Sequence, residues 1–182
     1  MRVFPLFLSP LLLVLADGLS AQSPSADNAE LIRNALSAAP PSVADGATVV
    51  AGSTVLRQGT NGWVCVPDNP ETANNSPICM DEQWREMMDA LKNQRAPRIT
   101  QVGISYMLQA GSPVSNIDPF ATGPTEDNQW ITEGFPHLMI LIPDHSTLEG
   151  ISTDPHNGGP WVLWKDTPYA FLIIPVVPPT DQ

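Results

Sequence analysis

The run Leu138-Met139-Ile140-Leu141-Ile142 contains only apolar side chains, and Pro136 and Pro143 stand on either side of it. An apolar run of this length without alternation is typical of a central strand buried on both faces. Proline cannot donate a hydrogen bond to a neighbouring strand, so the two prolines fit strand ends. Residues 99–108 alternate between larger side chains and small or polar ones, which predicts another strand whose larger side chains form its buried face.

Two hairpins extend the predicted sheet. Residues 54–58 and 63–66 flank a short polar gap that contains Asn61-Gly62, a strong turn signal between two strands. Residues 161–164 and 169–176 are mostly apolar and predict a second hairpin near the C-terminus. The antiparallel strands of hairpins therefore dominate the predicted sheet.

Two helices accompany these strands. Residues 28–38 show helical spacing of apolar residues behind possible caps at Ser25 or Asp27. Asp81 is positioned to cap a second helix that ends near Lys92. The chain is predicted to form one α+β domain, with a mainly antiparallel sheet and both helices packed on one of its faces.

The composition narrows the classes of function. The chain has 182 residues, of which 42% are hydrophobic, enough to form a core. It carries 8 basic and 19 acidic side chains, a formal net charge of −11. An acidic protein of this kind repels phosphate backbones and anionic lipid surfaces, so nucleic-acid binding and attachment to an anionic membrane are disfavoured.

The first residues have the pattern of a secretory signal peptide. Arg2 precedes an apolar stretch, and small or polar residues follow, so cleavage is expected after Ser20 or Ala21. The alternative is an uncleaved N-terminal anchor, for which the apolar run is short. We expect residues 1–21 to be removed and residues 22–182 to form a periplasmic or secreted domain with no stable membrane insertion. Residues 22–28 and 177–182 are expected to be loose tails.

Export affects the interpretation of the two cysteines, Cys65 and Cys79. An even number of cysteines in an oxidising compartment predicts a disulfide. Metal-binding or redox thiols are the alternative, but the spacing is not that of a C-x-x-C motif and no second pair exists. The sequence therefore favours a structural disulfide.

Histidines and acidic residues gather between residues 137 and 156. The segment holds all three histidines of the chain, His137, His145 and His156, along with Asp144, Glu149 and Asp154. His145, Glu149 and His156 could form a metal site, because imidazole and carboxylate groups suit zinc or iron. The alternative is that these side chains are solvated loop residues, since the spacing matches no metalloenzyme motif.

An aromatic group lies near the C-terminus and could bind a ligand. His156, Trp161, Trp164 and Tyr169 would supply an aromatic surface with hydrogen-bonding groups, next to the flexible Gly158-Gly159 pair. Such a surface suits a small organic ligand or a sugar. The simpler alternative is a tight turn before a hairpin, with the tryptophans in the core.

Several short strings also resemble a group of small exported bacterial proteins that have no assigned activity. They are residues 63–68, residues 79–81 with Trp84, residues 102–108, Pro136-His137, residues 154–160 and residues 167–169. The resemblance implies a single exported domain and carries over no catalytic residue and no cofactor.

Two functions are compatible with these patterns. The first is a non-enzymatic periplasmic or secreted domain that binds a small ligand or a protein partner, which fits the absence of catalytic motifs. The second is a hydrolase or metal-dependent enzyme that uses the His/Asp/Glu cluster between residues 137 and 156. The position of the histidines in the fold distinguishes the two.

Overall fold

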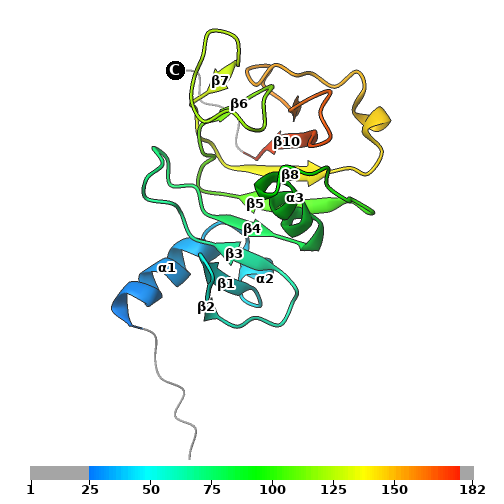
Figure 1. Ribbon diagram of the computed structural model, residues 1–182. Helices are drawn as coiled ribbons and strands as arrows, with labels where there is room; N and C mark the ends of the chain where they lie inside the picture. The colour runs from blue at the N-terminus through cyan, green and yellow to red at the C-terminus, as the bar shows by residue number, and fades with distance from the viewer. Residues whose placement is uncertain (1–24, 177–182) are drawn as a thin grey trace, which may run out of the picture.

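A computed structural model describes residues 25–176 (Figure 1). The predicted signal peptide and residues 22–24 and 177–182 lie outside the described residues. The helical elements are α1 (Ala26–Leu36), α2 (Pro41–Ala44), α3 (Glu82–Lys92) and the 3-10 turn η1 (His145–Leu148). The strands are β1 (Thr48–Ala51), β2 (Thr54–Arg57), β3 (Val64–Val66), β4 (Ile78–Met80), β5 (Gly103–Met107), β6 (Val114–Ser115), β7 (Trp130–Ile131), β8 (His137–Leu141), β9 (Trp161–Leu163) and β10 (Phe171–Pro175).

Eight of the strands form one sheet in the order β2-β1-β3-β4-β5-β8-β10-β9. All neighbouring pairs are antiparallel except β1 and β3, which run parallel. Strands β6 and β7 form a separate two-stranded sheet inside the long segment between β5 and β8. The prediction of a single α+β domain with a mainly antiparallel sheet is confirmed.

The predicted hairpin around Asn61-Gly62 is wrong. Strand β2 pairs with β1, and β1 lies between β2 and β3. The true hairpin joins β1 to β2 through a tight turn, in which Gly52 adopts a positive φ of 58°. Asn61 instead donates a hydrogen bond from its side-chain amide to the carbonyl of Val43, 2.7 Å away. The Asn61-Gly62 pair therefore belongs to the loop that connects β2 to β3 and not to a hairpin turn. The second predicted hairpin is confirmed as β9 and β10.

The two long helices lie on opposite faces of the sheet, which corrects the prediction that both cover one face. Cys79 is paired with Cys65 on one side and with Tyr106 on the other, so these side chains share a face. That face packs against α1. The next residue of β4, Met80, points to the opposite face and packs with Trp84 and Met87 of α3.

Helix α1 begins earlier than the sequence predicts. The side chain of Ser25 accepts a hydrogen bond from the backbone N–H of Asn28, 3.2 Å away, and so caps the first turn. Residues 26–28 are therefore helical and not part of a loose tail. Ala35 is fully buried beside the disulfide between Cys65 and Cys79, whose prediction is confirmed.

Helix α3 is held against the sheet by the cap that the sequence predicts. The Asp81 carboxylate accepts hydrogen bonds from the backbone N–H groups of Trp84, at 2.9 Å, and of Ile104 in β5, at 2.6 Å. Gly103 lies so close to the helix that an added Cβ would be 2.6 Å from Cβ of Gln83. Glycine is therefore required where α3 crosses β5.

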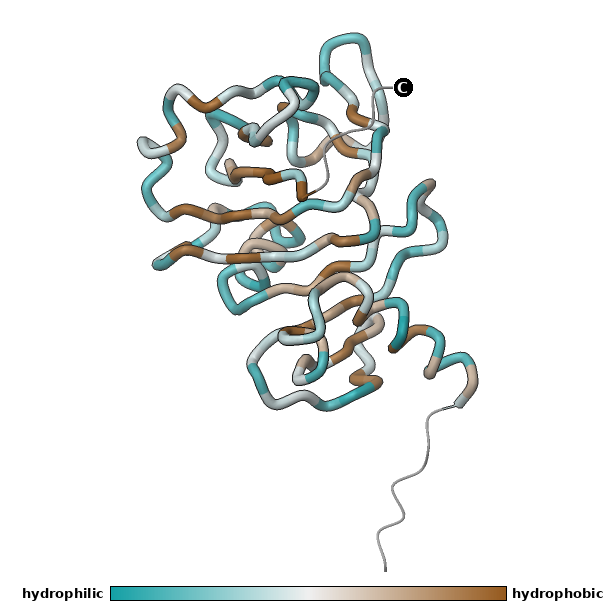
Figure 2. The backbone as a smooth tube through the Cα atoms, turned by 180° about the vertical axis from the view of Figure 1, so that it is seen from behind, coloured by the Kyte–Doolittle hydropathy of each residue, from teal (hydrophilic) through white to brown (hydrophobic). Residues whose placement is uncertain are grey.

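This close contact corrects the predicted burial of two strands. In β5 the face with Gly103 and Ser105 is fully buried, while Ile104 and Tyr106 are only half-buried. Small residues occupy the covered face because they let the helix approach. In β8, Leu138 and Ile140 are likewise half-buried, so the run is not enclosed on both faces. Figure 2 shows the apolar residues concentrated along the central strands.

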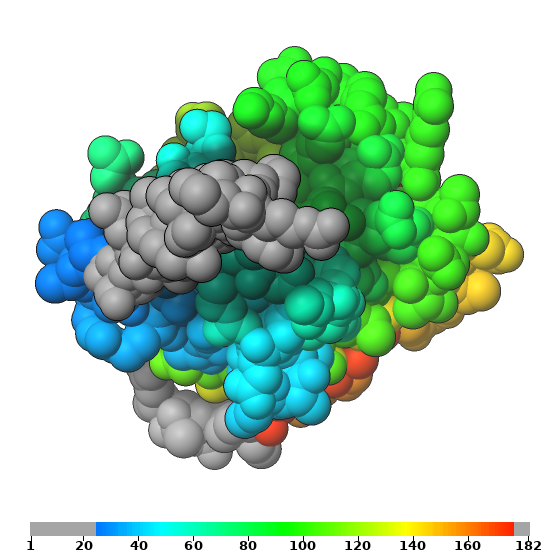
Figure 3. Space-filling view, turned by 90° about the horizontal axis from the view of Figure 1, so that it is seen from below, coloured from blue at the N-terminus to red at the C-terminus, as the bar shows by residue number. Residues whose placement is uncertain are grey.

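The sheet ends at β2 on one side and at β9 on the other. The β2 end of the sheet lies next to α1. In the view from below in Figure 3, these N-terminal parts of the fold are blue and cyan, and later parts of the chain, in green, lie beside them. At the other end, the outward N–H groups of Val162 and Trp164 donate to the carbonyls of Ser152, at 2.8 Å, and Asn116, at 2.9 Å. Of the helices in residues 25–176, none has the length and apolar character needed to cross a bilayer.

Candidate ligand-binding cavity

A cavity of about 290 Å³ lies on the α3 face of the sheet. The helix contributes Trp84, Met88 and Leu91 to its wall, and the small sheet contributes Val114 and Ile131. Side chains of β8, β9 and β10 complete it: His137, Met139, Trp161, Leu163, Phe171 and Ile173. Most of the wall is apolar, which is typical of a site for a small organic molecule.

His137 is the buried titratable side chain of this wall, whereas Glu133 is exposed. It is the first residue of β8 and is 6% exposed. Its Nδ1 lies 2.8 Å from the carbonyl oxygen of Phe135, and a carbonyl can only accept, so Nδ1 carries the proton. Burial lowers the pKa of this imidazole, and the hydrogen bond to Phe135 opposes that shift. The ring is therefore neutral at neutral pH.

The three tryptophans that line the cavity differ in their hydrogen bonds. The Nε1–H of Trp84 donates to the carbonyl of Met139 at 3.1 Å. The Nε1–H of Trp164 donates to the carbonyl of Ser115 at 2.9 Å. The Nε1 atom of Trp161 is buried and has no partner among the described residues. A buried indole normally finds an acceptor, so Trp161 differs from the other two tryptophans in leaving its donor unsatisfied.

His137 and Trp161 both pack near one phenyl ring. The ring centroid of Phe135 is 5.6 Å from that of His137 and 5.6 Å from that of Trp161. Phe135 belongs to the segment between β7 and β8 and also lines the cavity. The polar groups of the wall therefore meet around one aromatic side chain, and most of the remaining wall is apolar.

A second polar group lies at the rim. The hydroxyl oxygens of Ser76 and Ser112, both at the cavity wall, are 2.7 Å apart. Ser76 is held by the Asp68 carboxylate, which accepts its backbone N–H at 2.8 Å. Next to Ser112, an added Cβ on Gly111 would lie 3.0 Å from Cε1 of His137, so a glycine leaves room for the imidazole.

The residues predicted to bind a ligand are divided by the structure. Trp161 and Trp164 line the cavity. Tyr169 is buried elsewhere: its hydroxyl donates to the carbonyl of Arg95 at 2.9 Å, and its ring packs edge-on against Phe120. His156 is exposed in the loop before β9, where its backbone N–H donates to Asp154 at 2.9 Å.

The residues predicted to bind a metal are not brought together. His145 begins η1, and the carboxylate of Glu149 lies 3.7 Å from the ammonium group of Lys165. His156 is in the exposed loop after them. Within residues 25–176, no three His, Cys, Asp or Glu side chains form a group that could hold a metal ion.

The acidic residues of the predicted enzyme cluster have local roles in the loops. Asp144 caps η1 by accepting the backbone N–H of Ser146 at 3.0 Å, and hydrogen bonding to Ser146 lowers the pKa of its carboxyl. Asp154 accepts hydrogen bonds within its own turn. Ser105 of β5 is fully buried, and its hydroxyl donates to the carbonyl of Cys79 at 3.0 Å, so it is not exposed as a nucleophile would need to be.

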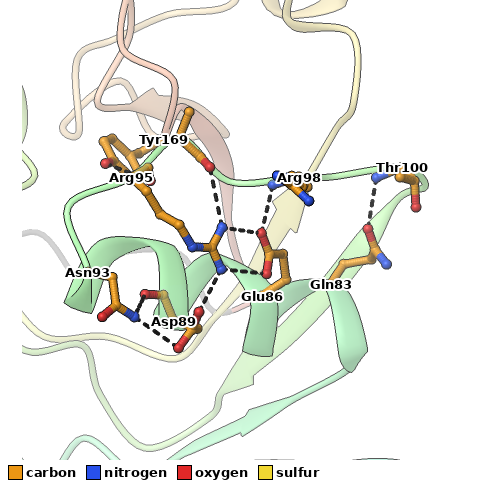
Figure 4. Close-up of polar contacts among 9 residues, drawn as sticks. Gln83, Glu86, Asp89, Asn93, Arg95, Arg98, Thr100 and Tyr169 are labelled. Carbon is orange, nitrogen blue, oxygen red and sulfur yellow. Dashed lines mark hydrogen bonds and ion pairs between the residues drawn. The ribbon is translucent and has the colours of Figure 1, made fainter.

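A network of three charged side chains supports the helix that forms one wall of the cavity. Both guanidinium nitrogens of Arg95 contact Glu86, at 2.6 and 2.8 Å, and one also contacts Asp89 at 2.6 Å (Figure 4). The hydrogen bonds to Arg95 and to the backbone of Arg98 lower the pKa of Glu86 to about 2. Because these charges are paired with each other, the network serves to fix α3 and the segment that follows it.

Sequence reasoning does not find the partners of Trp161 and Trp164 in this wall. Proximity in sequence groups His137 with the other histidines, whereas the fold places it beside Gly111 and Phe135. Gly111 and Trp161 are each more than 20 residues from His137 in the sequence. No local pattern connects them, because they come together only through the pairing of β8 and the packing of the long segment before it. Comparisons of the chain with protein families, curated proteins and solved structures give no match.

Proposed function

We propose that this chain is an exported, non-enzymatic domain that binds a small, largely apolar molecule in the cavity between α3, the central sheet and the β6–β7 sheet. The observation that carries this proposal is the cavity of about 290 Å³ with its largely apolar and aromatic wall. Its size is just below the range for small-molecule sites, about 300–1,000 Å³, so the ligand should be small.

Packing supports a binding role for this space. Protein interiors are normally filled to the density of organic crystals, and voids larger than a water molecule are few. An apolar cavity cannot be filled well by water, because water needs polar partners. An apolar ligand would restore the missing contacts with Trp84, Met139 and Leu163.

Two features support export. The sequence of residues 1–21 has the order of a signal peptide, with a charge, an apolar stretch and small residues. The disulfide between Cys65 and Cys79 is of the kind that persists in oxidising compartments. A periplasmic or secreted binding domain is consistent with both.

The proposal is tested with N-phenyl-1-naphthylamine, a dye whose fluorescence rises in apolar sites. We expect saturable binding to the folded protein. Val114→Trp places a large side chain in the cavity wall and should abolish the binding. The matched control is Val55→Trp, because Val55 is 54% exposed on β2, and it should bind as the wild type does. Equal dye binding by all three proteins would refute the proposal.

A further inference from the structure

The hydrogen-bonding groups of the cavity define the kind of ligand more closely. We infer that the ligand is a neutral molecule with an apolar body and a hydroxyl group, and that this hydroxyl donates its proton to Nε2 of His137. The inference rests on the proposed function and concerns the same cavity. It follows from the tautomer of His137 and the charge of the wall.

The tautomer of His137 determines what its free nitrogen can do. Since Nδ1–H donates to the carbonyl of Phe135, the neutral ring has its lone pair on Nε2. No hydrogen bond from the described residues reaches Nε2. An acceptor without a protein partner in the wall of a cavity can receive a hydrogen bond from a bound molecule, and a ligand hydroxyl is a suitable donor.

The free Nε2 acceptor distinguishes hydroxyl compounds from ethers and ketones. A hydroxyl is both a donor and an acceptor, whereas an ether or a ketone is only an acceptor. The Nε1–H of Trp161 is buried, so it is not a contact for an ether or ketone oxygen in the cavity. The wall therefore suits a hydroxyl compound better than either.

The charge of the wall excludes a strongly anionic ligand. Among the described residues that line the cavity, none is Lys or Arg, and Glu133 at the rim is acidic. A carboxylate or phosphate that entered would lose its hydration without gaining a cationic partner. The ligand should therefore enter as a neutral molecule.

A series of three probes tests the inference on the unaltered protein. Naphthalene has no polar group, 2-methoxynaphthalene has only an acceptor, and 2-naphthol has a donor and an acceptor on the same ring system. Each probe is used to displace N-phenyl-1-naphthylamine. We expect 2-naphthol to bind about tenfold more tightly than naphthalene, the effect of one buried hydrogen bond. The methoxy compound should show no such gain.

Two histidine variants assign the effect to its residue. His137→Phe should remove the preference for 2-naphthol while naphthalene still binds, and its folding is checked by its thermal unfolding. The matched control is His156→Phe, because His156 is exposed and does not line the cavity, so the preference should be kept.

The outcomes separate this inference from the proposed function. If naphthalene and 2-naphthol bind equally well to the wild type, the hydroxyl inference is overturned and the apolar binding site stands. The hydroxyl inference is also overturned if 2-methoxynaphthalene binds as much more tightly than naphthalene as 2-naphthol does. If neither the dye nor naphthalene binds, the proposed function fails and the inference fails with it.

Discussion

The two faces of the eight-stranded sheet are packed in opposite ways. On the α1 face, the buried core consists of small residues and the disulfide: Ala35, Ala38, Ala39, Ala47, Val49, Cys65 and Cys79. On the α3 face, the core contains three tryptophans, a tyrosine, a phenylalanine and several methionines. The cavity lies on this second face, among the largest side chains of the protein.

The difference shows how side-chain size determines where a cavity forms. Alanines allow α1 to approach the backbone of the sheet, so little space remains between them. Helix α3 also lies close to the sheet where it crosses β5 at Gly103. Beyond that crossing its face carries tryptophan and phenylalanine rings, and rigid rings in fixed orientations cannot close every gap between them. The α1 face can therefore stabilise the fold while the α3 face keeps space for a ligand.

The largest expected effect is on the α1 face. Replacing Cys65 and Cys79 together by serine removes a crosslink between residues 14 positions apart. We expect the free energy of unfolding to fall by about 3 kcal/mol, mainly because the unfolded chain gains freedom. Urea unfolding of both proteins under oxidising conditions measures this loss. An unchanged midpoint would show that the disulfide has no structural role.

Enlarging one side chain on each face should change the free energy of unfolding by a smaller amount and distinguish the two faces directly. Ala35→Leu adds three carbons beside the disulfide, where Ala35 is fully buried, and should destabilise the protein by about 2 kcal/mol through overpacking. Val114→Leu adds one carbon in the cavity wall and should cost less than about 1 kcal/mol, because space is available. Similar losses in urea unfolding would contradict the comparison.

The smallest expected effect on stability comes from the ion pair of Arg95 and Glu86, which helps to fix α3. Arg95 lowers the pKa of Glu86 from 4.5 to about 2, so the folded state favours the ionised carboxylate. Its stabilisation is fully present above pH 4.5 and is lost as the pH falls toward 2. The stability advantage of the wild type over Glu86→Gln should therefore shrink across this window in acid titrations followed by circular dichroism. An advantage that does not change with pH would contradict this assignment.

Local signals predict much of the fold. Asp81 caps α3, the cysteines form the disulfide, and the apolar segments at the C-terminus form β9 and β10, since each depends on residues close in sequence. The predicted hairpin at Asn61-Gly62 is wrong because β1, an earlier segment, lies between β2 and β3. A turn signal describes the turn and does not determine which strands pair.

The candidate site is less accessible to prediction. Trp161 and Trp164 can be suggested because aromatic residues often line binding sites. The role of His137 depends on its contact with Gly111 and Phe135, which the sequence does not show. His156 and Tyr169 are near the tryptophans in sequence but do not line the cavity. His156 is exposed in a loop and Tyr169 bonds to Arg95, so closeness in sequence does not bring their side chains to the site.

The way the sheet ends at β9 affects how the protein behaves at high concentration. An edge strand with free amide groups can recruit a second chain and begin aggregation. Here the amide groups of Val162 and Trp164, which face outward, are bonded to Ser152 and Asn116 of the same chain. Another molecule could add a strand at this edge only by breaking these bonds, so this end of the sheet is protected against intermolecular β-pairing.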